Sequence, residues 1–587
     1  MAKIVSDTKT DKQAGHAGAG TDEEFCPPGL TSKHQAKTRR MLATWRRKLG
    51  VGLLALLLIS SLLLAIPTTR YAVLGSFMQR EFVVQIKDTD TKQPVMAATV
   101  ELAGQKAETD AKGMAKIRAK VGDAKLTVTK KYYAKSVSEV LVPIAKKPGW
   151  EVVTLKATGR QVPVMVTNKI TGKPLAGALL IAAGTTGRTD KDGKVTMVLP
   201  ADLKSVDSKI SLDGYNAVNG PLLVSEQAVP QNTFQLVPQG SIYFLSKLSG
   251  RIDVVKTNLD GSGRKTVLAG TGKERNTDTI LLASRDWKYL ALKSTRDGGE
   301  FAKLFLIDTK DDSLKTIDEG KASFDAVGWS GHRFVYKIGR EGAKNWEPKG
   351  QALKSFDADS GKLTVIDETD GEGTGPGDYA FSLFGQVYIL DDELVYNKNW
   401  IAGGYAARLP GKQVSLVSVK ADGSARKTIK DFPVPADTLY HYSIDLRLYE
   451  AQEVYVQATG AQGVKASYFE YEDGVLSAKP DVTDQQFNEE YPTYLISPSG
   501  NKTFFGEARD GKNTLFVGDA AGSDKRQIVV LSEYTAYGWY TDDYVLVSKG
   551  GSELFIMPAA DVAPLKITDY HKPDVNLRGY GYGYGGL

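Results

Sequence analysis

Two patterns of hydrophobic and polar residues follow one another along the chain. Residues 49–66 are 18 consecutive uncharged, mostly apolar residues, and Pro67 ends the run. From residue 82 onward, short segments alternate apolar and polar positions, as in residues 82–86 and 194–198. Alternation with period two, broken by Asp-Gly turns, is typical of antiparallel β-strands. The sequence therefore predicts one apolar helix followed by an all-β body.

The apolar run is long enough to cross a membrane. At 1.5 Å per residue, 18 helical residues span about 27 Å, close to the roughly 30 Å hydrocarbon core of a bilayer. Its apolar residues cover every face, unlike a helix that packs one side on a globular core. We predict a retained signal-anchor at residues 49–66, because 48 residues precede the run and a cleavable signal peptide has a shorter apolar region. Cleavage of the segment is the alternative.

Charge around this helix sets the expected orientation. Residues 33–48 carry seven Lys and Arg, whereas residues 67–81 carry two. Basic residues favour the cytoplasmic side, so residues 1–48 are expected to be a disordered basic cytoplasmic tail. The sequence thus predicts a single-pass plasma-membrane protein that binds membrane lipid through residues 49–66. The net charge of +6 is small for 587 residues and comes partly from this tail, so we expect no nucleic-acid partner.

An internal repeat with an offset of 80 residues follows the helix. Residues 91–95 match residues 171–175, and residues 109–113 match residues 189–193. Alternating strands and Asp/Gly turns occupy both copies, which predicts two small β-domains. Their expected bounds are residues 82–156 and 160–238.

The motifs of these copies resemble the carboxypeptidase-regulatory-like family. The second copy reads Gly-Lys-Pro-Leu-Ala at residues 172–176, Thr-Asp-Lys-Asp-Gly at residues 189–193 and Gly-Tyr at residues 214–215. The first copy departs from the pattern by having Tyr132-Tyr133 for Gly-Tyr. The resemblance implies a seven-stranded immunoglobulin-like β-sandwich for each copy.

Residues 240–572 contain a second kind of repeat. Residues 284–292 align with residues 497–505, and residues 260–267 align with residues 422–429. Each unit contains several short strands separated by turns. A lone four-stranded sheet cannot bury both of its apolar faces, so we expect several such sheets to stack radially.

The Ser-Pro-Ser-Gly-Asn-Lys element and the Asp-Gly-Ser-x-Arg turns of these units resemble the TolB-like, WD40-like β-propeller family. Seven blades are predicted, with six as the alternative because the first unit is short; the units start near residues 241, 279, 324, 380, 441, 493 and 534. Residues 573–587 are rich in Gly and Tyr and are expected to be a flexible tail. Their use as a final strand that closes the ring is the alternative, which glycine disfavours.

No motif for catalysis or metal binding emerges. A Gly-x-Ser-x-Gly nucleophile elbow is missing, and the single Cys, Cys26, precedes the predicted helix. Aspartates at 88, 90, 190, 192, 357 and 359 are expected to form turns rather than calcium sites, residues 371–377 to form a flexible insertion, and His332, His441 and His571 to be surface or structural residues. We therefore assign no catalytic, cofactor-binding or metal-binding residue, and the ligand-binding residues stay unidentified.

The predicted architecture leaves two functions open. One is an extracytoplasmic binding or scaffolding protein of a bacterial cell envelope that engages a protein or glycan through its propeller. The alternative is a propeller-type polysaccharide hydrolase or lyase. Clustered carboxylates with shifted pKa values in the central cavity would indicate the enzyme. An exposed aromatic or apolar patch would indicate the binding protein.

Overall fold

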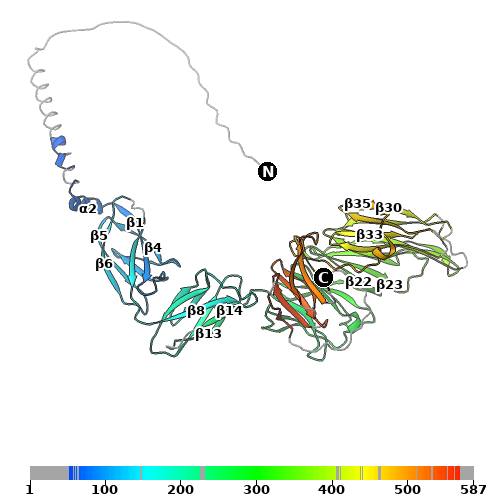
Figure 1. Ribbon diagram of the computed structural model, residues 1–587, viewed down its shortest axis with the longest axis horizontal. Coiled ribbons are helices and arrows are strands. Elements are labelled where there is room, and N and C mark those ends of the chain that lie inside the picture. Colours follow the sequence, from blue (N-terminus) through cyan, green and yellow to red (C-terminus); the bar gives the residue numbers. More distant parts are fainter. Residues whose placement is uncertain are drawn as a thin grey trace, which may run out of the picture. The chain divides into compact units, whose positions relative to one another are not determined.

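The structure is a computed structural model of the chain (Figure 1). It describes residues 52–568 except 57, 60, 62–64, 146–148, 225–231, 405–408, 410, 437, 439, 460–463, 510–511, 531–532, 552 and 561. Contacts divide the chain into two compact units. One unit holds the described residues up to 87 together with 98–129 and 135–155, and the other holds 88–97, 130–134 and the residues from 156 onward.

The first repeat forms two sheets of three and four strands. The order of the first is β4 (Met114–Lys120), β1 (Gln79–Asp88), β7 (Glu151–Leu155), and that of the second is β3 (Gln105–Glu108), β2 (Thr99–Leu102), β5 (Gly122–Thr129), β6 (Ser136–Val142). Alternate residues are buried along several of these strands, including Val84 and Ile86 on β1 and Val100 and Leu102 on β2. The period-two pattern of the sequence therefore marks the buried side of each sheet.

The second repeat has the same strand order. Its sheets are β11 (Lys194–Leu199), β8 (Arg160–Asn168), β14 (Thr233–Leu236), and β10 (Thr185–Arg188), β9 (Leu179–Ala182), β12 (Ser205–Ser211), β13 (Val218–Leu223). Val164 and Val166 of one sheet share an apolar core with Leu180 and Ile210 of the other. The two copies thus have equivalent topologies, and their assignment to the immunoglobulin-like class stays a prediction.

Seven sheets follow in chain order within the described part of residues 242–566. The first four contain β15 (Ile242–Ser246), β16 (Asp253–Thr257), β17 (Lys265–Leu268); β18 (Ile280–Ala283), β19 (Tyr289–Ser294), β20 (Lys303–Asp308), β21 (Ser313–Asp318); β22 (Ala322–Ser330), β23 (Arg333–Arg340), β24 (Gln351–Asp357), β25 (Leu363–Glu368); and β26 (Gly371–Gly375), β27 (Asp378–Leu390), β28 (Glu393–Gly404), β29 (Gln413–Lys420), β30 (Lys427–Pro433), with β31 (His441–Tyr442) paired to β28.

The last three sheets have four strands each. They contain β32 (Ile444–Glu450), β33 (Glu453–Ala458), β34 (Ser467–Glu472), β35 (Val475–Ala478); β36 (Leu495–Ile496), β37 (Lys502–Arg509), β38 (Lys512–Asp519), β39 (Arg526–Val530); and β40 (Tyr534–Thr541), β41 (Tyr544–Lys549), β42 (Glu553–Pro558), β43 (Leu565–Lys566). A short helix, α3 (Asp484–Phe487), precedes β36. Within each sheet the paired strands are antiparallel.

The first and last sheets of this series pack on each other. Ile242 and Phe244 of β15 share an apolar cluster with Leu546 of β41 and Ile556 of β42. On its other face, β15 places Tyr243 in a cluster with the second sheet. The sheets therefore close into a ring. The fold is a β-propeller (Figure 1).

The second sandwich also contributes to the cluster that joins the first and last sheets. Ile170 and Val237 belong to it, and both are less than a tenth exposed. Next to them, Asn168 donates a side-chain N–H to the Tyr544 hydroxyl at 3.1 Å, and Lys169 pairs with Asp260 at 2.6 Å. Apolar burial and these polar contacts attach the second sandwich to the propeller.

The predicted membrane helix lies at the edge of the described residues. Of residues 49–66, the structure describes 52–56, 58, 59, 61, 65 and 66, and all of these but Ile66 are helical. The apolar side chains described there are exposed: Leu53, Leu54, Leu56, Leu58, Ile59 and Ile66. No helix within the described residues is long and apolar enough to span a bilayer. Residues 1–48 and 573–587 lie outside the described residues.

Candidate functional site

The first propeller sheet contains three strands in the part of the chain that the structure describes. The alignment of residues 260–267 with residues 422–429 makes β16 and β17 equivalent to β29 and β30, the last two strands of their sheet. β15 is therefore equivalent to the second strand of the other propeller sheets, counted from the innermost strand. No described strand takes the innermost position of this sheet. We call the resulting junction between the last sheet, the first sheet and the second sheet the seam.

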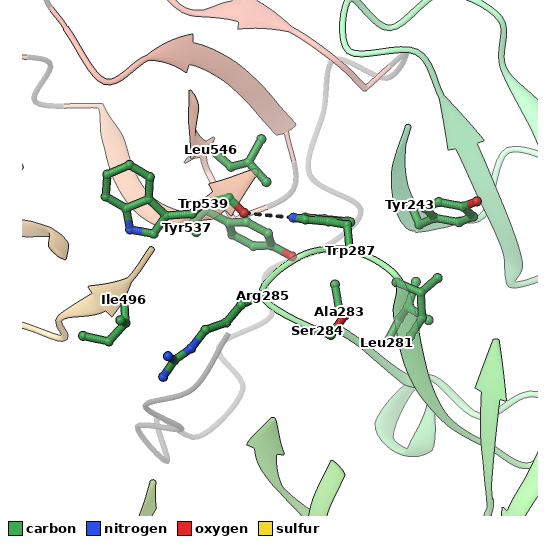
Figure 2. Close-up of a pocket in the computed structure, with 12 residues that line it drawn as sticks. Tyr243, Leu281, Ala283, Ser284, Arg285, Trp287, Ile496, Tyr537, Trp539 and Leu546 are labelled. Carbon is green, nitrogen blue, oxygen red and sulfur yellow. Dashed lines mark hydrogen bonds between the residues drawn. The ribbon is translucent and has the colours of Figure 1, made fainter. Parts of the chain in front are cut away.

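A pocket lies at the seam (Figure 2). Its walls come from the innermost strands β18, β36 and β40, from β15, β19 and β41, and from the turn after β18; the lining residues are Tyr243, Leu281, Ala283, Ser284, Arg285, Trp287, Leu290, Ile496, Tyr537, Gly538, Trp539 and Leu546. The free cavity is about 40 Å³. A single water needs about 10–15 Å³ of such free volume, so the cavity has room for a small chemical group. The lining is aromatic and apolar apart from serine and one arginine.

Trp287 spans the seam from the turn after β18. Its indole N–H donates to the main-chain oxygen of Trp539 at 2.9 Å, and its ring centroid lies 5.9 Å from that of Tyr540. Two other tryptophans of innermost strands make the same type of bond to a neighbouring sheet. Trp329 donates to the Leu282 oxygen at 3.1 Å, and Trp539 donates to the Leu495 oxygen at 2.7 Å. Trp287 therefore makes, across the seam, the kind of indole bond that elsewhere joins two adjacent sheets.

The backbone of Trp287 is left-handed, with a φ of 60°. The aligned position in the sixth sheet is Gly500, whose φ is 78°. A left-handed backbone costs a residue with a side chain of the order of 1–2 kcal/mol, whereas glycine adopts it freely. The indole must stabilise the seam by at least a comparable amount for the fold to hold it there.

Arg285 supplies the charge of the pocket. Its side chain is 25% exposed, and its ion pair with Asp391 is long, at 4.0 Å. Burial lowers the pKa of Arg285, and Asp391 opposes that effect. Figure 2 shows the guanidinium pointing away from Trp287, on the side of Ile496. A partly buried guanidinium with one distant counter-charge is suited to bind an anionic group of a ligand.

A cluster around His332 holds the turn that carries Arg285 and Trp287. His332 Nε2 lies 2.9 Å from Asp286 and Nδ1 lies 2.8 Å from Asp359. Tyr289 donates its hydroxyl to Asp359 at 2.9 Å, and Lys288 pairs with Asp286 at 2.9 Å. Burial lowers the pKa of His332, but the bonds to the two aspartates outweigh burial and raise it above 6.5. The expectation that His332 is a surface or structural residue agrees with this position.

Sequence spacing could not reveal this cluster, because 46 and 27 residues separate His332 from its two aspartates. The other histidines are elsewhere: His441 is exposed on β31, and His571 lies outside the described residues. The expected turn aspartates are bonded within turns. Asp88 accepts from the Asp90 and Thr91 amides, Asp190 from those of Asp192 and Lys194, and Asp357 from that of Ser360.

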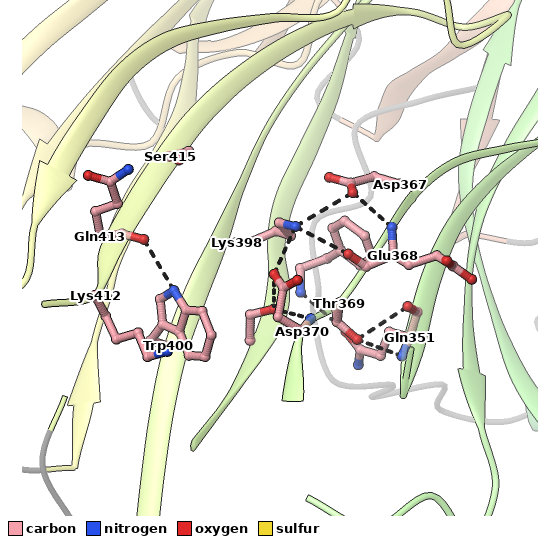
Figure 3. Close-up of polar contacts among 12 residues, drawn as sticks. Gln351, Asp367, Glu368, Thr369, Asp370, Lys398, Trp400, Lys412, Gln413 and Ser415 are labelled. Carbon is pink, nitrogen blue, oxygen red and sulfur yellow. Dashed lines mark hydrogen bonds and ion pairs between the residues drawn. The ribbon is translucent and has the colours of Figure 1, made fainter. Parts of the chain in front are cut away.

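A second polar network joins the third and fourth sheets (Figure 3). Asp367 accepts from the Tyr396 hydroxyl and pairs with Arg426, each at 2.8 Å, while Lys398 lies 3.5 Å from Asp367 and 3.1 Å from Asp370. The Asp367 side chain is 10% exposed. Because its charge is matched by two cations and a hydroxyl, the network is suited to hold the sheets together.

The expected flexible insertion at residues 371–377 is wrong in part, because residues 371–375 form strand β26 on the edge of the fourth sheet. β26 pairs with β27, and Glu372 forms an ion pair with Lys412, whose ammonium lies 4.5 Å from the Trp400 ring centroid. Cross-strand pairing and this ion pair outweigh the low strand propensity of glycine.

Three carboxylates of the fifth sheet lie close together. Ligand atoms of Glu453, Glu470 and Glu472 are all within 4.8 Å of one another, and Glu470 also pairs with Lys479. Burial, followed by repulsion from neighbouring carboxylates, raises the pKa of Glu453 to about 7. None of these residues lines the seam pocket.

No protein-family model matches this chain, and no curated protein matches it. Solved β-propeller structures resemble it at low identity. The propeller domain of the Trilobed protease from Pyrococcus furiosus is 15% identical, with a TM-score of 0.34, over 57% of this chain and 94% of that one. An oligogalacturonate lyase from Vibrio parahaemolyticus is 11% identical, with a TM-score of 0.29, over 56% and 84%.

The acylaminoacyl peptidase of Pyrococcus horikoshii is 14% identical, with a TM-score of 0.31, over 56% of this chain and 50% of that one. This chain thus spans half the length of that peptidase. Such likenesses concern the fold alone, and the activities of these enzymes do not carry over to this chain.

Proposed function

We propose that this chain is a membrane-anchored binding protein of a bacterial cell envelope, which engages a protein or glycan at the seam pocket of its propeller. Residues 49–66 anchor it in the plasma membrane, with the sandwiches and propeller outside the cytoplasm. The uncharged length of this run and the basic residues before it support the anchor. The exposed leucines of its described part are consistent with a lipid-facing helix.

The chemistry of the pocket carries the proposed binding role. Tyr537, Trp539 and Trp287 offer aromatic surface, and Arg285 offers a charge that a ligand can pair with. Tyr537 is 37% exposed and lines the pocket. Sites for small ligands combine an apolar lining with a few placed polar groups, as this pocket does. The cavity is small, so the ligand inserts one anionic or planar group and leaves the rest outside.

The lining residues favour binding over catalysis. Hydrolysis or elimination on a polysaccharide needs acid and base groups beside the scissile bond, and the pocket lining includes no carboxylate or histidine. A hydrolase or lyase is the second candidate because Glu453 has a pKa near neutrality beside two other carboxylates. That group is positioned to exchange a proton if a sugar reaches the fifth sheet.

Arrays of peptides and of envelope glycans, probed with the full chain in detergent micelles, test the proposed function. Signals should fall at least tenfold with Tyr537→Ala and with Arg285→Gln, because each substitution removes a pocket group (about 1.4 kcal/mol per tenfold). Arg118→Gln, at an exposed position of β4, is the matched control and should bind normally.

Equal binding by all three variants would overturn the assignment of the pocket. Cleavage of an array polysaccharide that is lost in Glu453→Gln, with Arg285→Gln still active, would replace the binding role with the enzymatic one.

A further inference from the structure

A short helix connects the predicted membrane segment to the first sandwich. α2 (Pro67–Gly75) begins with proline at its first turn, and Ile66 before it has an extended backbone, with φ −81° and ψ 120°. Proline at this position starts a helix and prevents the preceding one from running through it. α2 is therefore a separate helix rather than an extension of residues 49–66, and the chain changes direction between Ile66 and Pro67.

One side of α2 packs closely on the first sandwich. A Cβ atom on Gly75 would lie 2.5 Å from the main-chain oxygen of Val121, so only glycine permits this approach. The Tyr71 Cβ lies 3.9 Å from the position that a Cβ on Gly122 would take. Gly122 opens β5, and thus α2 is fixed against the end of the sandwich where this strand begins.

The other side of this segment exposes large apolar side chains. Phe77 is 71% exposed, Val73 47% and Ile66 47%. Val73 lies on α2, Ile66 directly precedes the helix, and Phe77 follows its last residue, Gly75, by two positions. A surface helix of a soluble domain normally presents polar side chains on the face that its own domain leaves uncovered. These exposed apolar residues, which we call the foot, lie within the 12 residues from Ile66, the last residue of the predicted membrane segment, to Phe77.

We propose that the foot, made of Ile66, Val73 and Phe77, lies in the interfacial layer of the membrane. The inference rests on the proposed anchor at residues 49–66, because the foot starts where that run ends. A helix in the interface buries its apolar face at the headgroup boundary, and the long side chain of Arg70 on α2 can reach lipid phosphates. Since α2 is fixed to the sandwich by Gly75, lipid contact at the foot also fixes the first sandwich relative to the membrane.

The single cysteine of the chain allows a direct measurement of depth. In a Cys26→Ser background, Phe77→Cys is spin-labelled and the full chain is reconstituted in vesicles of phosphatidylethanolamine and phosphatidylglycerol. Collisions of the label with oxygen, which concentrates in lipid, are compared with collisions with a water-soluble nickel chelate. Val137→Cys is the matched control: it is 51% exposed on β6, opposite Thr127 and five residues from Gly122, about 17 Å along the strand.

We expect the oxygen-to-nickel collision ratio to be several-fold higher at position 77 than at position 137, and Val73→Cys to behave like Phe77→Cys. Equal ratios at 77 and 137 in vesicles that carry the protein on flotation would overturn the foot and leave the anchor standing. Failure of the protein to float with the vesicles would overturn the anchor and the foot together.

Discussion

Trp287 and Trp539 are 252 positions apart in the sequence, yet the indole N–H of the first donates to the main-chain oxygen of the second at 2.9 Å. This bond links the turn after β18 to β40 across the sheet that has no described innermost strand. It uses a bulky residue at a backbone position that glycine occupies in the sixth sheet. The seam is therefore held by side chains where the other sheets have a strand.

Substitution of Trp287 should show what the indole contributes. Trp287→Phe keeps an aromatic ring and removes the N–H, so the propeller should lose about 1 kcal/mol. Trp287→Gly relieves the left-handed strain but removes the ring, and we expect a net loss of about 2 kcal/mol. Amide exchange of β40 and β41 during urea titration measures the local free energy of opening.

Trp150→Phe is the control for that series, because Trp150 is 56% exposed and also donates an indole bond, to Gln85. Its effect should be small and confined to the first sandwich. A Trp287→Gly protein that opens less readily than the natural one would mean that strain outweighs the contribution of the indole, contrary to our account.

Protonation of His332 should stabilise the turn after β18. Its folded pKa is raised above 6.5, so the folded state holds the proton more tightly than the unfolded state. The stabilisation is complete below pH 6.5 and is lost as the pH rises through the folded pKa. His332→Gln should remove this dependence from the melting temperature of the propeller. If the stability of the natural protein did not fall as the pH rises from 6.5 through the folded pKa, the hydrogen bonds of His332 to Asp286 and Asp359 would be contradicted.

Glu453 should make the stability of the protein depend on pH between 4.5 and about 7. Its folded pKa is about 7 against an ordinary 4.5, so the folded state binds the additional proton between these values. Stability contributed by this group is therefore highest below pH 4.5 and falls as the pH rises toward 7. At neutral pH and above, Glu453→Gln should be more stable than the natural protein by about 1 kcal/mol or more, after allowance for partial exposure.

The exposed Glu139→Gln on β6 provides the comparison for Glu453, and should leave the pH dependence unchanged. If Glu453→Gln were less stable than the natural protein at neutral pH, a counter-charge, such as a bound cation, would have to offset the repulsion among the three carboxylates.

Loss of the Asp367 charge should weaken the contact between the third and fourth sheets. Asp367→Asn leaves Lys398 and Arg426 without their shared carboxylate, and Lys398 is 17% exposed. Breaking a buried ion pair costs about 3 kcal/mol, whereas an exposed pair contributes less than about 1 kcal/mol. Asp392→Asn, in the exposed pair with Lys420, is the matched control. Chemical unfolding followed at the β24–β28 amides distinguishes the two, and equal effects would argue against the network.

Strands of the two sandwiches such as β1 and β4 were predictable because they alternate buried and exposed residues. Propeller strands such as β20 are buried on both faces, and they were predictable from their turns and repeats instead. The repeat offsets also predicted two related β-domains and a series of propeller sheets. Residues 371–375 escaped prediction because their glycines suggest a loop, and the pairing partner β27 and the counter-charge Lys412 lie outside the local sequence.

The site itself was only partly visible in the sequence. The alignment of residues 284–288 with residues 497–501 already placed Trp287 opposite Gly500, and that exchange was the available signal. His332, Asp286 and Asp359 meet only when the second and third sheets pack, so no local spacing connects them. Arg285 likewise becomes a pocket residue only through the closure of the ring.

Ile170 and Val237 have a consequence for how the protein unfolds. These two residues of the second sandwich complete the cluster between the first and last propeller sheets, which is the joint that lacks a described innermost strand. Removing the second sandwich would uncover Ile242 and Ile556 to water at that joint. The propeller and the second sandwich should therefore melt as one cooperative body, and a fragment that begins at the first propeller strand should be prone to open and aggregate there.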